Sequence, residues 1–350
     1  MSIEPIGYER YPIQDGSTDG SQPPDIQDYC ASNNENHDFD IATRIRALQE
    51  HGIELISCRD IDPGSLSEAP HSSLHMVKTP TSRLLMEHTS GAKPSAEPQI
   101  ICLPGLSENI VHKYDKIFHD QLSTMLSGLT VTSIGANAIG IRGERDRASR
   151  ETVAEERLQI TEAVTDGRKV LVVGTSMGSV YETDIVNLNL DEGEPVNIQG
   201  MVYFAPAVVS PQYAKQRMLG QFFPQLSIDM TRHIHRQPMR DRLRLTGEVA
   251  MWGMQAAREL PSLAHQAREL VRGTGVEKIE RIAAKGYPIL VIVGGHDAVG
   301  ELRMWQGVAD KYSNIKLLVL QNHGHELPFE PRKAARKLSK EILQSGILFA

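Results

Sequence analysis

The sequence is short of aromatic residues and cysteines, and it contains no long apolar run. Aromatic residues make up only 5% of the 350 residues, so aliphatic side chains must form most of any core. The three cysteines, Cys30, Cys58 and Cys102, are scattered and odd in number, which argues against a disulfide framework and a Cys-x-x-Cys zinc site. No stretch approaches the roughly 20 apolar residues that cross a bilayer, and no secretory signal pattern is present. We therefore expect a cytoplasmic protein without a transmembrane segment.

Metal-ligand spacing is absent as well. His233 and His235 are two positions apart in a stretch that we expect to be helical, where their side chains point to different faces. No cluster of carboxylates has a convincing ligand spacing. The sequence therefore predicts neither a metal nor a cofactor.

Acidic residues are concentrated at the start of the chain. Residues 1–40 contain nine Asp and Glu and a single Arg, a net charge of −8, so the rest of the chain carries +1 of the total of −7. The same 40 residues have few aliphatic side chains, which predicts an acidic flexible tail. The nearly neutral remainder indicates no nucleic-acid surface.

Apolar runs alternate with helical patterns along most of the remaining chain. This alternation predicts an α/β fold with a mostly parallel central sheet flanked by helices. Expected strands are 74–77, 84–87, 100–103, 131–134, 170–173, 198–204, 289–293 and 315–320, and expected helices are 110–126, 150–164, 180–189 and 333–343.

The same patterns suggest domain boundaries. Residues 41–72 are expected to form an accessory helix and strand, and residues 73–206 with 288–350 the core. Residues 207–287 contain no clear strand, which predicts a helical insertion. Because loops at the carboxyl ends of parallel strands lie above the active site, this insertion would form a lid.

A glycine-flanked serine follows one of the predicted strands. The segment Gly174–Gly178 reads Gly-Thr-Ser-Met-Gly and comes directly after the apolar run Val170–Val173. This pattern is typical of a nucleophile elbow, a sharp turn from strand to helix with Ser176 at its apex. Bulky side chains two residues to either side of the serine would collide, so both positions need glycine.

A serine hydroxyl needs a base within hydrogen-bond reach, and that base needs an orienting acid. Asp297 lies in a glycine-rich loop after the predicted strand 289–293. His323 and His325 lie in the loop after the next strand, 315–320. The chain order is therefore serine, aspartate, histidine.

With these motifs in this order, the chain resembles the serine hydrolases of the α/β-hydrolase fold over residues 73–206 and 288–350. The resemblance implies Ser176 as the nucleophile, Asp297 as the acid and His325 as the base. The segment from Gly324 to Pro331 is similar to the Gly-His loop of the family, which favours His325. His323 remains the alternative base, because both histidines share one short loop.

The resemblance also implies an oxyanion hole made of two backbone N–H groups. One donor would be Met177, which follows the nucleophile, and the other Leu106, in the loop after strand 100–103. Pro104-Gly105 stands where the family commonly has His-Gly, so this loop lacks a side chain that often braces it. The donor role uses backbone only and survives that change.

The function that follows from the resemblance is cleavage of a carboxylic ester or thioester through an acyl-enzyme. Methionine and aromatic residues of the predicted lid suggest a small-molecule substrate with an apolar acyl or alkyl part. One alternative is an amide or peptide hydrolase of aminopeptidase type, with Glu248 or Glu259 holding the free amine. Another is a non-catalytic binding protein on the same fold. The oligomeric state stays open.

Overall fold

A computed structural model describes most of the chain outside its first 40 residues. The described residues are 41–61, 72–81, 83–89, 98–105, 112–126, 128–135, 149–208, 275–297, 299–325 and 331–349, with isolated positions between 228 and 246. Within these ranges, no helix combines the length and the apolar character that crossing a membrane requires.

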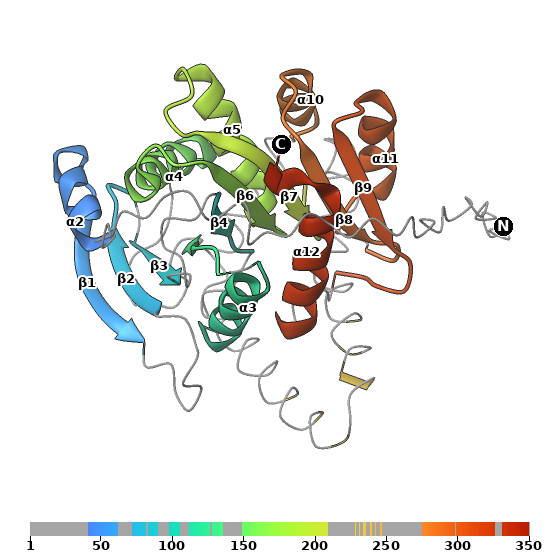
Figure 1. The fold of residues 1–350 in the computed structure, drawn as a ribbon, viewed down its shortest axis with the longest axis horizontal. Helices are drawn as coiled ribbons and strands as arrows, with labels where there is room; N and C mark the ends of the chain where they lie inside the picture. The colour runs from blue at the N-terminus through green and yellow to red at the C-terminus, as the bar shows by residue number, and fades with distance from the viewer. Residues whose placement is uncertain are drawn as a thin grey trace, which may run out of the picture.

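One nine-stranded sheet forms the centre of the molecule, in the order β1-β2-β3-β5-β4-β6-β7-β8-β9 (Figure 1). The first three strands run antiparallel and join β5, and all pairings from β5 through β4 to β9 are parallel. The strands are β1 (Glu54–Ile61), β2 (Ser72–Lys78), β3 (Arg83–Thr89), β4 (Gln99–Leu103), β5 (Val131–Ile134), β6 (Val170–Thr175), β7 (Ile198–Phe204), β8 (Ile289–Gly294) and β9 (Ile315–Leu320).

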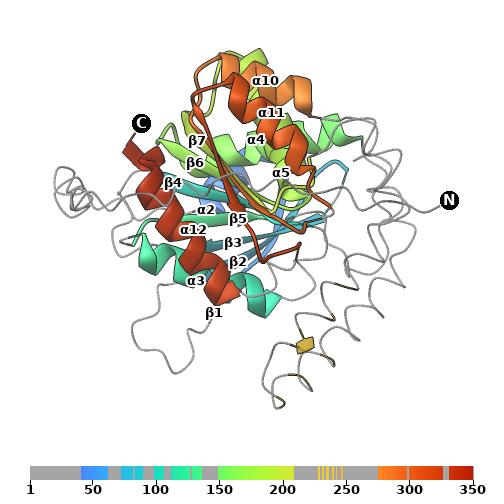
Figure 2. The ribbon, with the colours of Figure 1, turned by 90° about the vertical axis from the view of Figure 1, so that its right-hand side faces the viewer.

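Helices cover both faces of this sheet (Figure 2). On one face lie α3 (His112–Met125) and α12 (Pro331–Ser345), with the short η5 (Ile347–Phe349). The other face carries α2 (Ile41–Arg46), η1 (Ala47–His51), α4 (Arg150–Thr165), α5 (Gly178–Asp191), α10 (Val276–Ala284) and α11 (Leu302–Lys311).

The strand β6 shows why a run of consecutive apolar residues forms a central strand. Side chains alternate across a strand, and both faces of this sheet are covered. Val170 and Val172 pack into the core on the α5 face, whereas Leu171 and Val173 pack into the core on the α3 face. All six residues of β6 are buried.

The predicted fold class, a mostly parallel sheet between two layers of helices, is confirmed. The structure adds two features. The strand expected in residues 41–72 is not separate from the core, because β1 pairs with β2 and extends the same sheet. A helix that the sequence reading did not place, α11, connects β8 to β9 and buries Trp305.

The predicted lid and tail fall largely outside the described residues. The structure does not describe the tail, residues 1–40, and it describes only isolated positions of residues 209–274. The predicted lid 207–287 ends with α10, which packs against α5 in the layer of helices. Both segments therefore stay predictions.

Candidate active site

Ser176 occupies the turn between β6 and α5 in an unusual backbone conformation. Its φ is +51°, in the left-handed region that a residue with a side chain rarely adopts. The Ser176 N–H donates to the carbonyl of Phe204 in β7, and the Ser176 carbonyl accepts from the Ala207 N–H. Strain of this kind persists only where the surroundings hold it, and it concentrates at functional sites.

The two glycines around Ser176 permit close approaches of backbone. A Cβ on Gly174 would lie 2.6 Å from Ser179 Cα, and a Cβ on Gly178 would lie 2.7 Å from the carbonyl oxygen of Pro104. Real Cβ atoms essentially never approach other atoms this closely. The start of α5 therefore packs closely against the end of β6 and the end of β4.

The structure brings the predicted nucleophile, base and acid together. Ser176 Oγ lies 2.8 Å from His325 Nε2, and His325 Nδ1 lies 3.0 and 3.1 Å from the two carboxylate oxygens of Asp297. All three residues are buried. Asp297 also accepts hydrogen bonds from the N–H groups of Val299 and Gly300, at 2.8 and 2.9 Å. These donors hold the carboxylate in place beneath the imidazole.

A close contact between two loops places His325. Gly294 ends β8, and a Cβ there would lie 2.6 Å from the carbonyl oxygen of Gly324. The His296 N–H donates to the His323 carbonyl, and the Gly295 N–H donates to the Leu320 carbonyl. The loop that carries Asp297 is thereby bonded to the loop that carries His325.

Of the two histidines in that loop, only His325 reaches the serine hydroxyl. His323 and His296 are both exposed, whereas His325 is 3% exposed. From the sequence alone His323 is an alternative base, because a loop of unknown path can turn either histidine inward. The tight packing at Gly294 decides between them.

The structure describes only one of the two predicted oxyanion donors. Met177 is the N-cap residue of α5, a position whose N–H has no acceptor within the helix. Leu106 lies outside the described residues. The carbonyl oxygen of Pro104 is close to Gly178, so the loop that leads to Leu106 starts beside the elbow.

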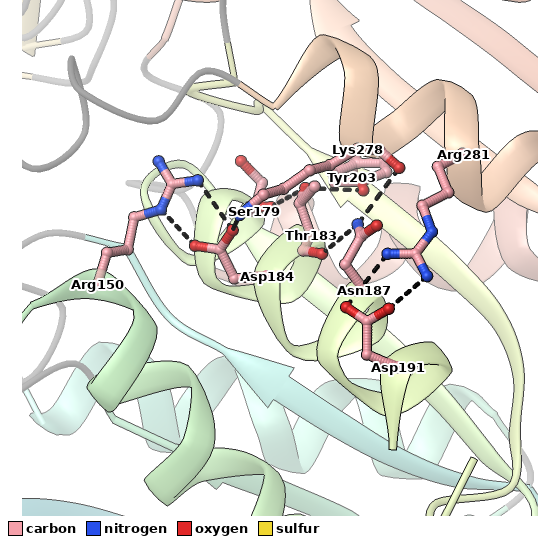
Figure 3. A network of polar contacts seen from close by, with 9 residues as sticks. All are labelled: Arg150, Ser179, Thr183, Asp184, Asn187, Asp191, Tyr203, Lys278 and Arg281. Atoms are coloured by element: carbon pink, nitrogen blue, oxygen red, sulfur yellow. Dashed lines mark hydrogen bonds and ion pairs between the residues drawn. The ribbon is translucent and has the colours of Figure 1, made fainter. Parts of the chain in front are cut away.

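Buried polar side chains of α5 anchor the elbow, and sequence reasoning missed them. The Ser179 hydroxyl donates to the Ser176 carbonyl and accepts from the Ala207 N–H. Thr183, one turn further, hydrogen-bonds to the hydroxyl of Tyr203 in β7 at 2.9 Å (Figure 3). The available signal is the number of polar residues on the helix that directly follows the predicted elbow.

Ion pairs join α5 to the helices on either side. Asp184 is buried and pairs with Arg150, at the start of α4, and with Lys278 in α10, whose Nζ lies 2.6 Å away (Figure 3). Nearer the end of α5, the exposed Asp191 pairs with Arg281 of α10. The helix that follows Ser176 is thus held from two neighbouring helices.

The sequence matches the family described as Serine aminopeptidase, S33, over residues 152–332, which is just over half of the chain. The chain belongs to the S33 serine aminopeptidase family. The part that matches this family contains Ser176, Asp297 and His325. Membership makes the protein a hydrolase of the α/β-hydrolase fold.

Solved structures support the same fold for this S33 family member. A membrane phospholipase A, described as a bacterial virulence factor, is similar with a TM-score of 0.56 at 14% identity, over 89% of this chain and 94% of that chain. A bromoperoxidase from Bacillus anthracis is similar with a TM-score of 0.53 at 14% identity, over 78% of this chain and 99% of that chain. Est816, an N-acyl homoserine lactone degrading enzyme, is similar with a TM-score of 0.53 at 16% identity, over 76% of this chain and 98% of that chain. At these identities the similarity shows the fold alone. A search of curated proteins found no match.

Proposed function

We propose that this protein is a serine hydrolase whose nucleophile is Ser176. The observation that carries the proposal is the 2.8 Å distance from Ser176 Oγ to His325 Nε2, with the other imidazole nitrogen on Asp297. A carboxylate beside Nδ1 favours the tautomer with its proton on Nδ1, which leaves the Nε2 lone pair free to accept the serine proton. The left-handed conformation of Ser176 supports the same role.

In the reaction, Ser176 Oγ forms a bond to the carbonyl carbon of the substrate while His325 Nε2 takes the hydroxyl proton. The carbonyl oxygen becomes an oxyanion, which accepts hydrogen bonds from the N–H groups of Met177 and Leu106. His325 then donates the proton to the leaving oxygen or sulfur as the bond to the acyl carbon breaks. Water then attacks the acyl carbon and gives a proton to His325. His325 returns that proton to Ser176 Oγ as the bond between Oγ and the acyl carbon breaks, which releases the acid and free Ser176.

The proposed substrate is a small carboxylic ester or thioester with an apolar acyl or alkyl part. Est816 is named as degrading N-acyl homoserine lactones, and a lactone is a cyclic ester. A second structurally similar protein is named a membrane phospholipase A. The methionines and aromatics between residues 207 and 287, which we propose to form a helical lid, supply apolar contacts for such a group.

Peptide cleavage is the second candidate, and the family description favours it. An aminopeptidase must hold the free amine of its substrate, and Glu248 or Glu259 would provide the carboxylate. Both lie outside the described residues. The two candidates share Ser176, His325 and Asp297 and differ only in how the substrate is held.

A fluorophosphonate probe tests the proposed nucleophile, with the wild type compared with Ser176→Ala and the labelled peptide located by mass spectrometry. We expect labelling of Ser176 that the variant loses. A folded wild-type protein that stays unlabelled would contradict the proposal and favour a binding protein on the same fold. Rates on p-nitrophenyl esters of increasing chain length and on aminoacyl p-nitroanilides then separate an esterase from an aminopeptidase.

A further inference from the structure

Glu182 is a carboxylic acid buried directly beneath the nucleophile elbow. It lies on α5, is 0% exposed, and accepts a hydrogen bond from the Val202 N–H of β7 at 3.2 Å. In the described part of the chain no Lys, Arg or His forms an ion pair with it. A buried carboxyl without a cation is costly, so its presence at this place needs an explanation.

The missing side chain of Gly174 makes room for this carboxyl. A Cβ on Gly174 would overlap Glu182 Oε2, and it would also crowd the backbone of Ser179. The carboxyl therefore occupies the space over the end of β6, two residues before Ser176. The absence of a side chain at Gly174 thus permits both the close approach of α5 and the position of the Glu182 side chain.

The surroundings favour the neutral form of this carboxyl. Burial raises the pKa of Glu182 well above the usual range of a glutamate, and the Val202 N–H lowers it by a smaller amount. Burial likewise raises the pKa of the Tyr203 hydroxyl in β7. A neutral carboxyl still accepts a hydrogen bond from a backbone N–H.

We propose that Glu182 is a positioning residue that holds α5 at a set distance from β7 and thereby holds Ser176 in its strained conformation. The proposal rests on Ser176 being the nucleophile. The Ser176 N–H is bonded to Phe204, and Glu182 is bonded to Val202, two residues earlier in the same strand. The two bonds fix the serine and the helix that follows it to one strand. A shift of about 1 Å at such a site can cost on the order of 100-fold in rate.

Three substitutions separate this role from simple space filling. Glu182→Gln keeps the size and an acceptor oxygen, Glu182→Met keeps the size without an acceptor, and Glu182→Asp pulls the carboxyl back by one methylene. We expect Glu182→Gln to label with the fluorophosphonate probe within about twofold of the wild type. We expect the Met and Asp variants to label about ten- to 100-fold more slowly, and to lower kcat with little change in KM on the best ester.

Glu156 supplies the matched control. It is also a buried glutamate, on α4, but it accepts its hydrogen bonds from Thr79 and Thr81 in the loop between β2 and β3. Glu156→Met should lower stability without slowing the labelling of the folded protein.

The outcomes distinguish this inference from the proposed function. No labelling of the wild type would overturn the proposed function itself. Labelling of the wild type and of folded Glu182→Met at equal rates would leave Ser176 as the nucleophile and overturn the positioning role. If the Met variant does not fold, the Gln and Asp variants test the proposal. Equal labelling rates for these two variants and the wild type would overturn the positioning role of Glu182.

Discussion

Gly178 packs its Cα directly against the carbonyl of Leu103, at the end of β4, and leaves no room for a Cβ. This approach brings the start of the helix behind Ser176 into contact with the loop that leads to Leu106. This one glycine thus sets the distance between the start of α5 and the end of β4.

Substitution of Gly178 by alanine tests that contact. Because the added methyl would meet backbone atoms, which cannot rotate away, we expect Gly178→Ala to destabilise the protein by about 1–3 kcal/mol or more and to abolish probe labelling. Urea unfolding and the labelling assay measure the two effects. Gly307 is the control: it lies exposed in α11 with nothing near its Cβ position, so Gly307→Ala should stabilise by about 0.5–1 kcal/mol. An active, fully stable Gly178→Ala variant would refute the close contact.

Alanine substitutions of the two histidines in the loop after β9 should have opposite effects on activity. His325→Ala removes the group that accepts the Ser176 proton, and we expect kcat to fall by about 10⁴-fold or more. His323→Ala removes an exposed side chain, and we expect activity close to that of the wild type. Steady-state rates on one ester decide, and a large loss in His323→Ala alone would exchange the roles of the two residues.

Substitution of Asp297 should abolish most of the activity without unfolding the protein. Asp297→Asn keeps an oxygen that can accept the N–H groups of Val299 and Gly300, but it removes the negative charge beside His325. We expect kcat to fall by about 10⁴-fold with a nearly unchanged melting temperature. A variant with more than a tenth of the wild-type kcat would show that another group orients the base.

The ion pairs of α5 should differ strongly in their effect on stability. Asp184→Asn removes a buried charge that pairs with the buried Arg150, and we expect a loss of about 3–5 kcal/mol. Asp191→Asn breaks an exposed pair with Arg281, and we expect a much smaller change because water screens it. Urea unfolding of the two variants compares them directly, and similar losses in both would contradict this prediction.

Glu182 should make stability depend on pH in a defined direction. The pKa of its carboxyl is higher in the folded than in the unfolded state, so between these two values the folded state binds more protons. The stability of the wild type relative to Glu182→Gln is therefore largest below about pH 4 and falls as pH rises. The steepest expected decline is about 1.4 kcal/mol per pH unit.

Urea unfolding of both chains between pH 4 and 8 measures this difference, since all other groups titrate alike in the two proteins. Among the described residues, Glu182 and Asp184 on α5 both influence Tyr203 on β7, and β6 contributes no titratable side chain. A difference that stays flat across this range would mean that Glu182 ionises as freely in the folded state as in the unfolded chain.

Most of the fold could be predicted because its signals are local. A run such as Val170–Val173 is apolar throughout since both faces of β6 are covered, and Gly174 and Gly178 mark the turn that follows. The apolar pattern does not reveal the helix α11, and it predicts an accessory strand in residues 41–72 where β1 is an edge strand of the sheet. Whether a strand joins a sheet depends on its pairing with a distant segment, which a single run of residues does not reveal.

The residue types of the candidate site and their order can be read from the chain, because each follows a strand end and strand ends can be recognised from apolar runs. That His325 rather than His323 meets Ser176 follows from the folded molecule, since it depends on the packing of Gly294 against the neighbouring loop. The folded molecule alone also reveals Glu182 beneath the elbow. A buried acid resembles an exposed one in the sequence, and only the strand packed over it removes the water.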